Sequence, residues 1–303
     1  MRRSNRLLNC HVMGALCAVP LIFNSVSVFA DEASAVPTVE SAPAATATPT
    51  EPAPDFTLSF NLGLYSEYMF RGVALSDGPA LQGGIDLGHK SGFYVGTWWS
   101  NIDKEFTGHG DGFSGGNHLE TDWYAGYAHT LDSGFGVNLL ANYYYYPDNE
   151  KSFSFDGSND GKRQNVLETS IALSYKWLTY TFYYIPGNYY GAAPSGTRNL
   201  QSDTTGATYN EVKFNYTLPI GDLNLLAKIG YQHTPNLLGS QSDVAIGLSR
   251  NFSIPSSGKP IEGFSAGAYY TDTFNVKSEA YYVTADGRDV NEEKIWFFVK
   301  RTW

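Results

Sequence analysis

Charged side chains stand at alternate positions inside otherwise apolar stretches of this 303-residue chain. The first stretch runs from Ser66 to Asp86, SEYMFRGVALSDGPALQGGID: Glu67 and Arg71 precede a Ser-Asp-Gly-Pro break, and Gln82 follows it. Carboxylates, a guanidinium and an amide that share one face can bind ions or a polar solute, or they can pair with one another. Which of these they do depends on the elements that carry them.

Those elements are predicted to be β-strands, because apolar and polar residues alternate with period two. In FTLSFNLGLYSEYMF, the residues Leu58, Leu62 and Leu64 fall on one face, and Ser59 and Asn61 fall on the other. The same alternation recurs in about twelve runs of roughly ten residues or a little more, the length of an outer-membrane strand. The predicted spans are 56–72, 79–90, 92–103, 118–130, 133–147, 164–176, 177–187, 207–220, 222–233, 240–252, 261–274 and 291–303.

The connections between these runs alternate in length. Tight turns at 90–92, 131–134, 176–177 and 219–222 are interleaved with longer polar stretches at 104–117, 148–163, 187–206 and 275–290, while 73–78 and 253–260 are intermediate. Short periplasmic turns and long external loops are typical of outer-membrane barrels, and an even strand number places both termini in the periplasm. We therefore predict an all-β fold over residues 55–303: a transmembrane antiparallel up-and-down barrel of about 12 strands.

If the leucines of the first run face lipid, the charged positions face the lumen. The side chains predicted to point inward are Glu67, Arg71, Gln82, Asp86, Glu120, Asp122, Glu168, Glu211, Lys213, Lys228, Asp243, Lys294 and Lys300. Residues four apart on a strand lie roughly 13 Å apart, so Glu67 and Arg71 are not expected to pair directly. The set forms either a charged pore lining that selects a solute or an ion-pair network that plugs a narrow barrel; about twelve strands fit both.

Both ends of the chain fit export to an outer membrane. Residues 1–30 have a basic start, an apolar stretch and a small-residue end, which is the pattern of a secretory signal peptide. Residues 31–54 are rich in Pro, Ala and Thr and predict a disordered periplasmic spacer. The terminal Trp303 matches the aromatic end that the barrel-assembly machinery reads, although Arg301 departs from the apolar alternation before it.

Composition excludes several functional classes. Both cysteines, Cys10 and Cys17, lie within the signal, so the mature chain has no disulfide, thiol nucleophile or Cys-ligated metal. Removal of the signal with its three arginines takes the formal charge from −10 to −13, which argues against a nucleic-acid partner. The chain is rich in tyrosine, and clusters such as Tyr143–Tyr146 and Tyr183-Tyr184 lie near predicted strand ends, which favours the aromatic girdles of a membrane barrel over a soluble β-sandwich.

Catalysis is not expected. The chain has no G-x-S-x-G or H-E-x-x-H motif, and the histidines after residue 30 form no recognisable catalytic constellation. The glycine pairs do not follow the phosphate-loop spacing either. We therefore expect no catalytic residues, no cofactor and no metal site.

One segment, Ser66–Asn101, resembles the TorF-like porin family of proteobacterial proteins. The resemblance is carried by Phe70-Arg71-Gly72, Pro79-Ala80, Gln82-Gly83-Gly84, Asp86 and Ser100-Asn101, and further along by Glu120, Asp122 and Glu168. Ala74 stands where the motif usually has a serine. The resemblance implies an outer-membrane barrel and supplies no substrate, because the function of that family is largely unassigned.

These observations predict a porin-like channel for passive diffusion of small hydrophilic solutes in the outer membrane of a Gram-negative bacterium. The expected partners are outer-membrane lipid, the barrel-assembly machinery, periplasmic chaperones and the solutes themselves, and no nucleic acid. A non-conducting structural or adhesive barrel is the first alternative. A barrel enzyme such as a lipase is the second.

Overall fold

A computed structural model describes residues 54–103, 118–147, 165–191, 204–235, 240–276 and 287–303. Within them, one closed barrel has the strand order β1-β14-β13-β12-β11-β10-β9-β8-β7-β6-β5-β4, and β2-β3 form a separate two-stranded sheet. The strands are β1 (Phe56–Tyr65), β2 (Met69–Phe70), β3 (Val73–Ala74), β4 (Ala80–His89), β5 (Phe93–Asn101), β6 (Leu119–Thr130), β7 (Phe135–Tyr145), β8 (Val166–Tyr175), β9 (Leu178–Ile185), β10 (Ala207–Thr217), β11 (Leu223–His233), β12 (Gln241–Ile254), β13 (Ile261–Phe274) and β14 (Lys294–Thr302). A single 3₁₀ turn, η2 (Tyr189–Gly191), is the helical element of the described residues.

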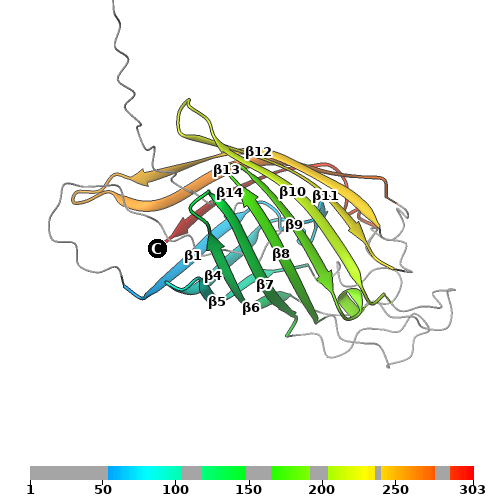
Figure 1. The fold of residues 1–303 in the computed structure, drawn as a ribbon. Coiled ribbons are helices and arrows are strands. Elements are labelled where there is room, and N and C mark those ends of the chain that lie inside the picture. The colour runs from blue at the N-terminus through cyan, green and yellow to red at the C-terminus, as the bar shows by residue number, and fades with distance from the viewer. Residues whose placement is uncertain (1–53, 104–117, 148–164, 192–203, 236–239, 277–286) are drawn as a thin grey trace, which may run out of the picture.

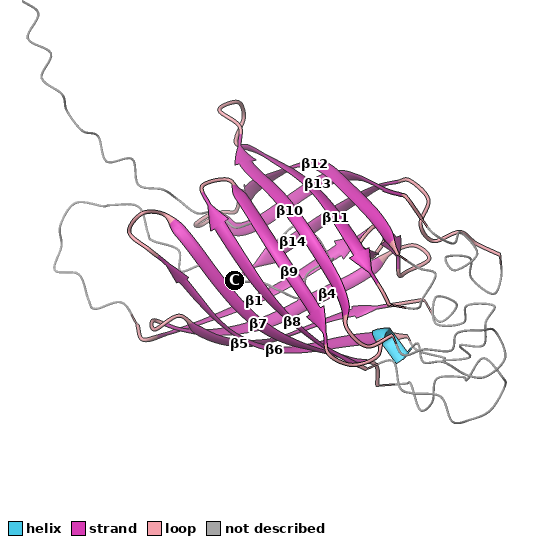
Figure 2. Cartoon of the chain, turned by 45° about the vertical axis from the view of Figure 1, so that its right-hand side comes forward, coloured by secondary structure: helices cyan, strands magenta, loops and turns pink. Residues whose placement is uncertain are grey.

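Each barrel strand pairs antiparallel with its neighbours in sequence, and β1 closes the ring against β14 with Leu64 opposite Val299. The tilted strands form one continuous wall in both ribbon views (Figures 1 and 2). Because the strand number is even, β1 begins and β14 ends at the same rim, where Trp303 N–H donates to Phe60 O at 2.9 Å. That rim carries the short turns, and the C-terminus is marked near it in Figure 1.

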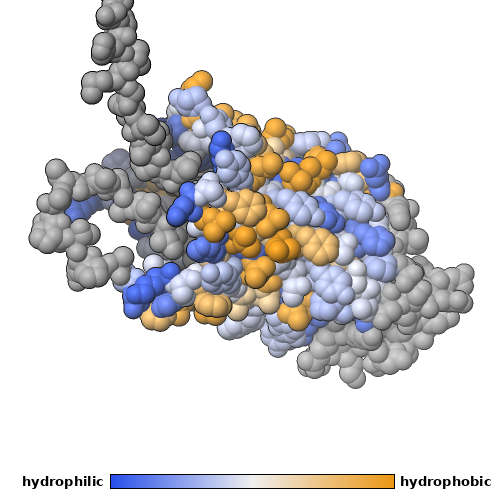
Figure 3. Space-filling view, in the orientation of Figure 1, coloured by the Kyte–Doolittle hydropathy of each residue, from blue (hydrophilic) through white to orange (hydrophobic). Residues whose placement is uncertain are grey.

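The wall is apolar outside and polar inside, the reverse of a soluble protein. Ile229, Ile246 and Ile295 point outward and are 50%, 52% and 66% exposed, whereas Glu120 and Asp243 point inward and are 1% and 0% exposed. Apolar side chains gather across the outer face of the strands in Figure 3. An exposed apolar belt of this extent indicates a lipid environment, since water would penalise it.

Among the described residues, no helix is long and apolar enough to cross a membrane. The predicted all-β, twelve-stranded closed barrel is confirmed. The predicted spans from 79–90 onward match β4 to β14 to within a few residues. The predicted signal peptide 1–30, nearly all of the predicted spacer 31–54 and most of the longer loops lie outside the described residues.

The first predicted strand, 56–72, is wrong in its second half. β1 ends at Tyr65, and the chain then leaves the wall. Residues 66–79, which we call the lumen hairpin, contain β2 and β3, and β2–β3 pair only with each other. In a wall strand, successive side chains alternate between exposed positions that face lipid and positions that face the lumen. Tyr68, Met69 and Phe70 do not alternate, because all three are buried. A run buried on both faces cannot stay in a wall that has lipid on one side.

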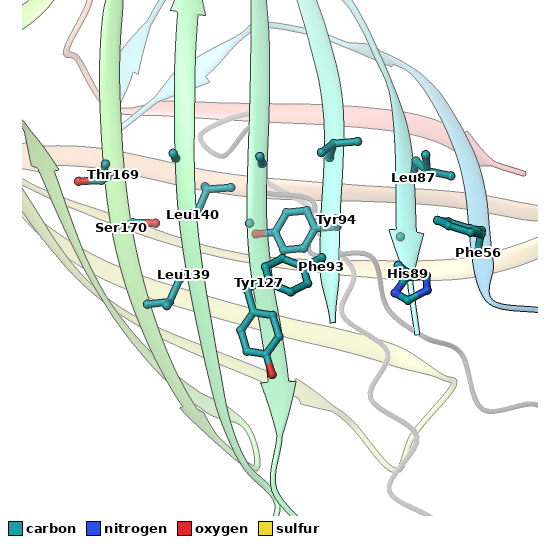
Figure 4. A pocket seen from close by; sticks show the side chains of 15 residues that line it. Phe56, Leu87, His89, Phe93, Tyr94, Tyr127, Leu139, Leu140, Thr169 and Ser170 are labelled. Atoms are coloured by element: carbon teal, nitrogen blue, oxygen red, sulfur yellow. The ribbon is translucent and has the colours of Figure 1, made fainter. Parts of the chain in front are cut away.

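An apolar groove of about 670 Å³ lies on the wall over β4 to β8, near the rim with the short turns. Phe93, Tyr127 and Leu139 line it, as Figure 4 shows. Phe93 and Tyr127 also pack ring against ring, with centroids 4.9 Å apart. Most of the lining belongs to the outward-facing set, so the groove is part of the lipid-facing surface and not of the charged interior.

We expect Ile229→Lys to destabilise the barrel by about 2–4 kcal/mol, since it places a charge in the apolar belt. Ile229 lies between Val212 and Val244 in register, so both of its direct cross-strand partners are apolar. Urea unfolding in lipid vesicles measures the change, and Ile229→Leu is the matched control. Equal stability of the lysine variant and the control would show that this face does not contact lipid.

Candidate functional site

The lumen hairpin is a tight local fold. Its strands are joined through Arg71 and Gly72, whose φ angles are +49° and +80°. Tyr68 N–H donates to Ser76 Oγ at 2.8 Å, and Leu75 N–H donates to Tyr68 O at 2.7 Å. These bonds satisfy backbone donors that no wall strand reaches. The hairpin is therefore an ordered element of the interior.

Contacts with the loop rim hold the base of the hairpin. Ala74 N–H donates to Val290 O at 2.7 Å, and Asp103 N–H donates to Leu75 O at 2.8 Å. Arg288 bridges Asp77 at 3.1 Å and Asp103 at 2.5 Å. The first loop is thus tied to the segments that follow β5 and precede β14.

Arg71 carries the tip of the hairpin across the lumen to the opposite wall. Its Nη2 lies 2.9 Å from both carboxylate oxygens of Glu168 on β8, and its Nη1 donates to Gln232 Oε1 on β11 at 2.9 Å. Its carbonyl oxygen accepts a hydrogen bond from Gln241 Nε2 on β12 at 2.9 Å. The guanidinium is 3% exposed, so this network lies in the interior and not at the rim.

Three rings enclose the same guanidinium. Its central carbon lies 4.1 Å from the ring centroid of Tyr209, 4.8 Å from that of Phe70 and 4.9 Å from that of Tyr183. All are within the range of an attractive cation–π contact. An ammonium could not reach Glu168 and Gln232 from two separate nitrogens or stack as a plane among the rings, so lysine is a poor substitute at residue 71.

Gly72 lets the tip approach the wall closely. A Cβ at this position would lie 2.5 Å from Thr273 Cγ2 and 3.0 Å from Asp243 Cβ. The positive φ independently favours glycine. Both constraints arise from the fold of the hairpin against β12 and β13.

Charge is divided unevenly around the interior. Strands β4 to β9 contain no Lys or Arg, yet β4, β6 and β8 present Asp86, Glu120, Asp122 and Glu168 to the lumen. We call this the acidic wall. Arg71 reaches it from the hairpin, because the strands themselves supply no cation.

The opposite side is balanced by its own strands. Lys213 Nζ lies 3.1 Å from Glu211, and Lys228 Nζ lies 3.4 Å from Glu211 and 3.6 Å from Asp243. Tyr209 Oη also donates to Asp243 at 3.0 Å. This mixed wall on β10 to β12 forms a paired network.

Glu120 and Asp122 on β6 form the centre of the acidic wall. Tyr68 of the hairpin donates to Glu120 Oε1 at 2.8 Å, and Asn142 Nδ2 donates to Asp122 Oδ2 at 3.1 Å. Burial of Tyr68, together with the negative charge of Glu120, raises the pKa of its hydroxyl, which keeps it a proton donor. Nearer the turn rim, Tyr124 donates to Asp86.

The residues that we predicted to point inward occupy three settings. Arg71 lies on the hairpin and not on a strand, and Glu67 near its base is 3.6 Å from Lys294. Lys300 lies on β14 between Gly63 and Ser265 in register, closer to the turn rim. The remaining predicted positions on strands with buried inward side chains are Gln82, Asp86, Glu120, Asp122, Glu168, Glu211, Lys228 and Asp243, with Lys213 partly buried. Whether they line a conducting pore stays a prediction.

Several residues of the site were not predicted. The sequence did not single out Tyr68 or Tyr209 and suggested a girdle position for Tyr183, yet all three are buried around Arg71 or Glu120. Gln232 and Gln241 bind the hairpin tip. Their inward parity on a strand is a signal available in the sequence, but their partner is not, because Arg71 and Gln232 are 161 residues apart.

The fold and interior define a class: a closed β-barrel with an apolar exterior, a charged lumen and an inserted loop. A family model described as "Bacterial protein of unknown function (Gcw_chp)" matches residues 49–303, and the chain belongs to this family. The TorF-like family named from the hairpin motif is not confirmed. No curated protein matches the chain.

Among solved structures, the chain is similar to a KdgM porin, with 10% identity, a TM-score of 0.44, and coverage of 81% of this chain and 98% of that one. It is also similar to Salmonella typhi OmpF, with 10% identity, a TM-score of 0.38, and coverage of 82% and 97%. For Acinetobacter baumannii OccAB4 the values are 11%, 0.36, 81% and 56%. Similarities at this level do not indicate what this chain binds or carries.

Removal of the Arg71 side chain leaves Glu168 buried without its cation. We expect Arg71→Ala to lower the free energy of unfolding by about 3–5 kcal/mol. The double variant Arg71→Ala/Glu168→Gln should lose clearly less than the sum of the single variants, since the orphaned charge is gone. Urea unfolding in detergent or vesicles measures the free energy of unfolding of the wild type, the two single variants and the double variant, which together form a double-mutant cycle.

Arg250→Ala is the matched control for that cycle, because Arg250 is an exposed arginine on β12. It should change stability by less than about 0.5 kcal/mol. Additive losses in the Arg71/Glu168 cycle would mean that the two side chains do not interact in the membrane-inserted protein.

Proposed function

We propose that this protein is an outer-membrane, porin-like channel for small hydrophilic solutes, with the lumen hairpin as its constriction. The observation that supports this most directly is a closed barrel whose exterior is apolar and whose interior is charged and polar. A polar, charged lumen inside an apolar exterior is the arrangement expected of a membrane barrel that passes hydrophilic solutes.

The interior divides into two parts along the axis. Toward the loop rim, the hairpin, its rings and the ion pairs fill the space, and Tyr68, Glu120 and Arg71 are all at most 3% exposed. Toward the turn rim, inward positions are small or polar and partly exposed, for example Ser170, Ser174 and Thr179. A solute on this route meets a polar vestibule on one side of the hairpin, and the hairpin sets the narrowest cross-section.

The same proposal includes location and partners. Short turns and both strand termini share one rim, which we assign to the periplasm, with the longer loops outside the cell. Lipid contacts the outer belt, and the barrel-assembly machinery recognises the β14 end at Trp303 together with periplasmic chaperones. In this proposal, solutes pass through the barrel by passive diffusion, and the protein catalyses no reaction.

A second candidate is a non-conducting structural or adhesive barrel. One observation favours it: Arg71 is buried and held by Glu168, Gln232 and Gln241, so the hairpin plugs the interior as a fixed element. The two candidates differ in a single property, which is passage of ions through the folded barrel.

Single-channel recording in a planar bilayer separates them. We expect the full mature chain, refolded and purified, to give discrete conductance steps that persist under moderate voltage, because the vestibule is polar and the constriction charged. Heat-modifiability on a gel verifies folding beforehand. A folded barrel that gives no steps would refute the channel and leave the structural role.

The reversal potential in a salt gradient tests the constriction. Arg71 is the cation that faces the acidic wall, so Arg71→Ala should shift selectivity toward cations. Arg250→Ala is the matched control, because it removes an arginine from the exposed surface, and it should have no effect. An unchanged reversal potential in Arg71→Ala would remove Arg71 from the conduction path.

A further inference from the structure

The groups that hold the guanidinium of Arg71 come largely from the barrel wall. Glu168 on β8 lies 2.9 Å from Nη2, and Gln232 on β11 accepts from Nη1 at 2.9 Å. The rings of Tyr183 on β9 and Tyr209 on β10 have their centroids 4.9 Å and 4.1 Å from the central carbon. Four successive strands therefore each contribute one group to the same cation. We call these four side chains the wall cation site.

The strand register brings the members of this site together. Tyr183 stands opposite Tyr209, and Tyr209 stands opposite Gln232, so three members lie in one row across β9, β10 and β11. On β8, Ser170 stands opposite Tyr183, and Glu168 lies two residues from Ser170 on the same inner face. The sheet fixes these positions, so the hairpin is not needed to assemble the site.

Hydrogen bonds within the wall also orient its groups. Gln232 Nε2 donates to Thr208 O at 3.1 Å, which leaves its Oε1 to face the guanidinium. The hydroxyl of Tyr209 donates to Asp243 at 3.0 Å, which holds the ring in place. Neither bond involves the hairpin. Groups that are oriented in advance bind a ligand with a smaller loss of conformational freedom.

Without Arg71, the wall cation site would lack a positive charge. Tyr144 donates to Glu168 Oε1 at 3.2 Å, but a hydroxyl is neutral. Strands β4 to β9 contain no Lys or Arg that could replace the guanidinium. A buried carboxylate beside an oriented amide oxygen is costly unless a cation with hydrogen-bond donors binds both.

We propose that the wall cation site recognises a solute that carries a guanidinium or a similar planar cation, and that Arg71 is a tethered stand-in which this solute displaces. The inference rests on the proposed function, since a solute must first be able to enter the barrel. A planar cation places donors from two nitrogens against Glu168 and Gln232 while its faces meet the rings. The acidic wall favours the approach of a cation.

Chemical rescue of Arg71→Ala tests the site. The substitution removes the guanidinium and leaves the wall groups in place, so free guanidinium at millimolar concentration should bind there. We expect a saturable rise in the melting temperature of the folded variant in detergent, by about 3–6 °C at roughly ten times the Kd. Such concentrations lie far below the molar range in which guanidinium denatures proteins. Urea, which is planar and neutral, should give no rise.

Three further proteins serve as controls. Arg71→Ala/Glu168→Gln removes the carboxylate and should bind guanidinium at least about tenfold more weakly. The wild type, whose own Arg71 fills the site, should show no rise, and neither should Arg250→Ala, which loses an exposed arginine. Heat-modifiability establishes that each protein is folded. An equal rise in all of them, an equal rise with urea, or no rise in folded Arg71→Ala would overturn the site.

A second measurement keeps Arg71 and asks whether a solute displaces it. Val73→Cys places a thiol on β3 of the hairpin, opposite Phe70, where the native side chain is 7% exposed. L-arginine should raise severalfold the rate at which a small water-soluble maleimide labels this thiol, because withdrawal of the tip exposes it. L-citrulline, in which a neutral ureido group replaces the guanidinium, should not.

A labelling rate that L-arginine leaves unchanged, or that both compounds raise equally, would mean that the wall cation site holds Arg71 alone and would overturn its role in solute recognition. This measurement also decides the matter if Arg71→Ala does not fold. Neither experiment depends on conductance. A barrel that binds guanidinium but carries no current would refute the channel, whereas a conducting barrel that does not distinguish guanidinium from urea would refute the site.

Discussion

The contact between Arg71 and Glu168 is the one on which the arrangement of the interior depends. It joins a loop that leaves β1 to a strand on the far side of the lumen, through one guanidinium nitrogen, Nη2, that lies 2.9 Å from both carboxylate oxygens. No wall strand carries the hairpin, and its tip is held by this contact together with hydrogen bonds to Gln232 and Gln241. A buried pair of this kind contributes little net stability, but it makes one position of the hairpin far more favourable than its alternatives.

The need for Arg71 follows from the composition of the wall. Six successive strands, β4 to β9, carry acids and no Lys or Arg, so their inward charges cannot be neutralised within the sheet. On β10 to β12, Lys213 and Lys228 stand beside Glu211 and Asp243, and the sheet neutralises itself. The asymmetry means that the hairpin supplies electrostatic balance to one wall while it packs against both.

The strands of the barrel wall could be predicted from the sequence. Alternation with period two located β4 to β14 and the inward parity of Asp86, Glu120 and Lys228, because lipid on one face and polar interior on the other enforce the pattern residue by residue. The hairpin could not be located in this way, since alternation runs on through Glu67 and Met69 after β1 has ended.

Two local features of the sequence mark the position of the lumen hairpin. Tyr68, Met69 and Phe70 are consecutive and bulky, which suits a segment buried on all sides, and Gly72 directly after Arg71 allows a tight reversal. The partners of Arg71 lay beyond sequence reasoning, because 97 residues separate it from Glu168 and parity alone does not say which inward side chain it meets.

The acidic wall explains why the hairpin cannot satisfy every charge it approaches. Nη2 of Arg71 binds both oxygens of Glu168, Nη1 binds Gln232, and the rings of Phe70, Tyr183 and Tyr209 surround the guanidinium, so this cation is committed to one place on the acidic wall. Tyr68, the nearest hairpin group to Glu120, is neutral and offers one proton. The hairpin therefore places an opposite charge against Glu168 but offers Glu120 only a neutral donor, so its electrostatic effect is confined to one part of the acidic wall.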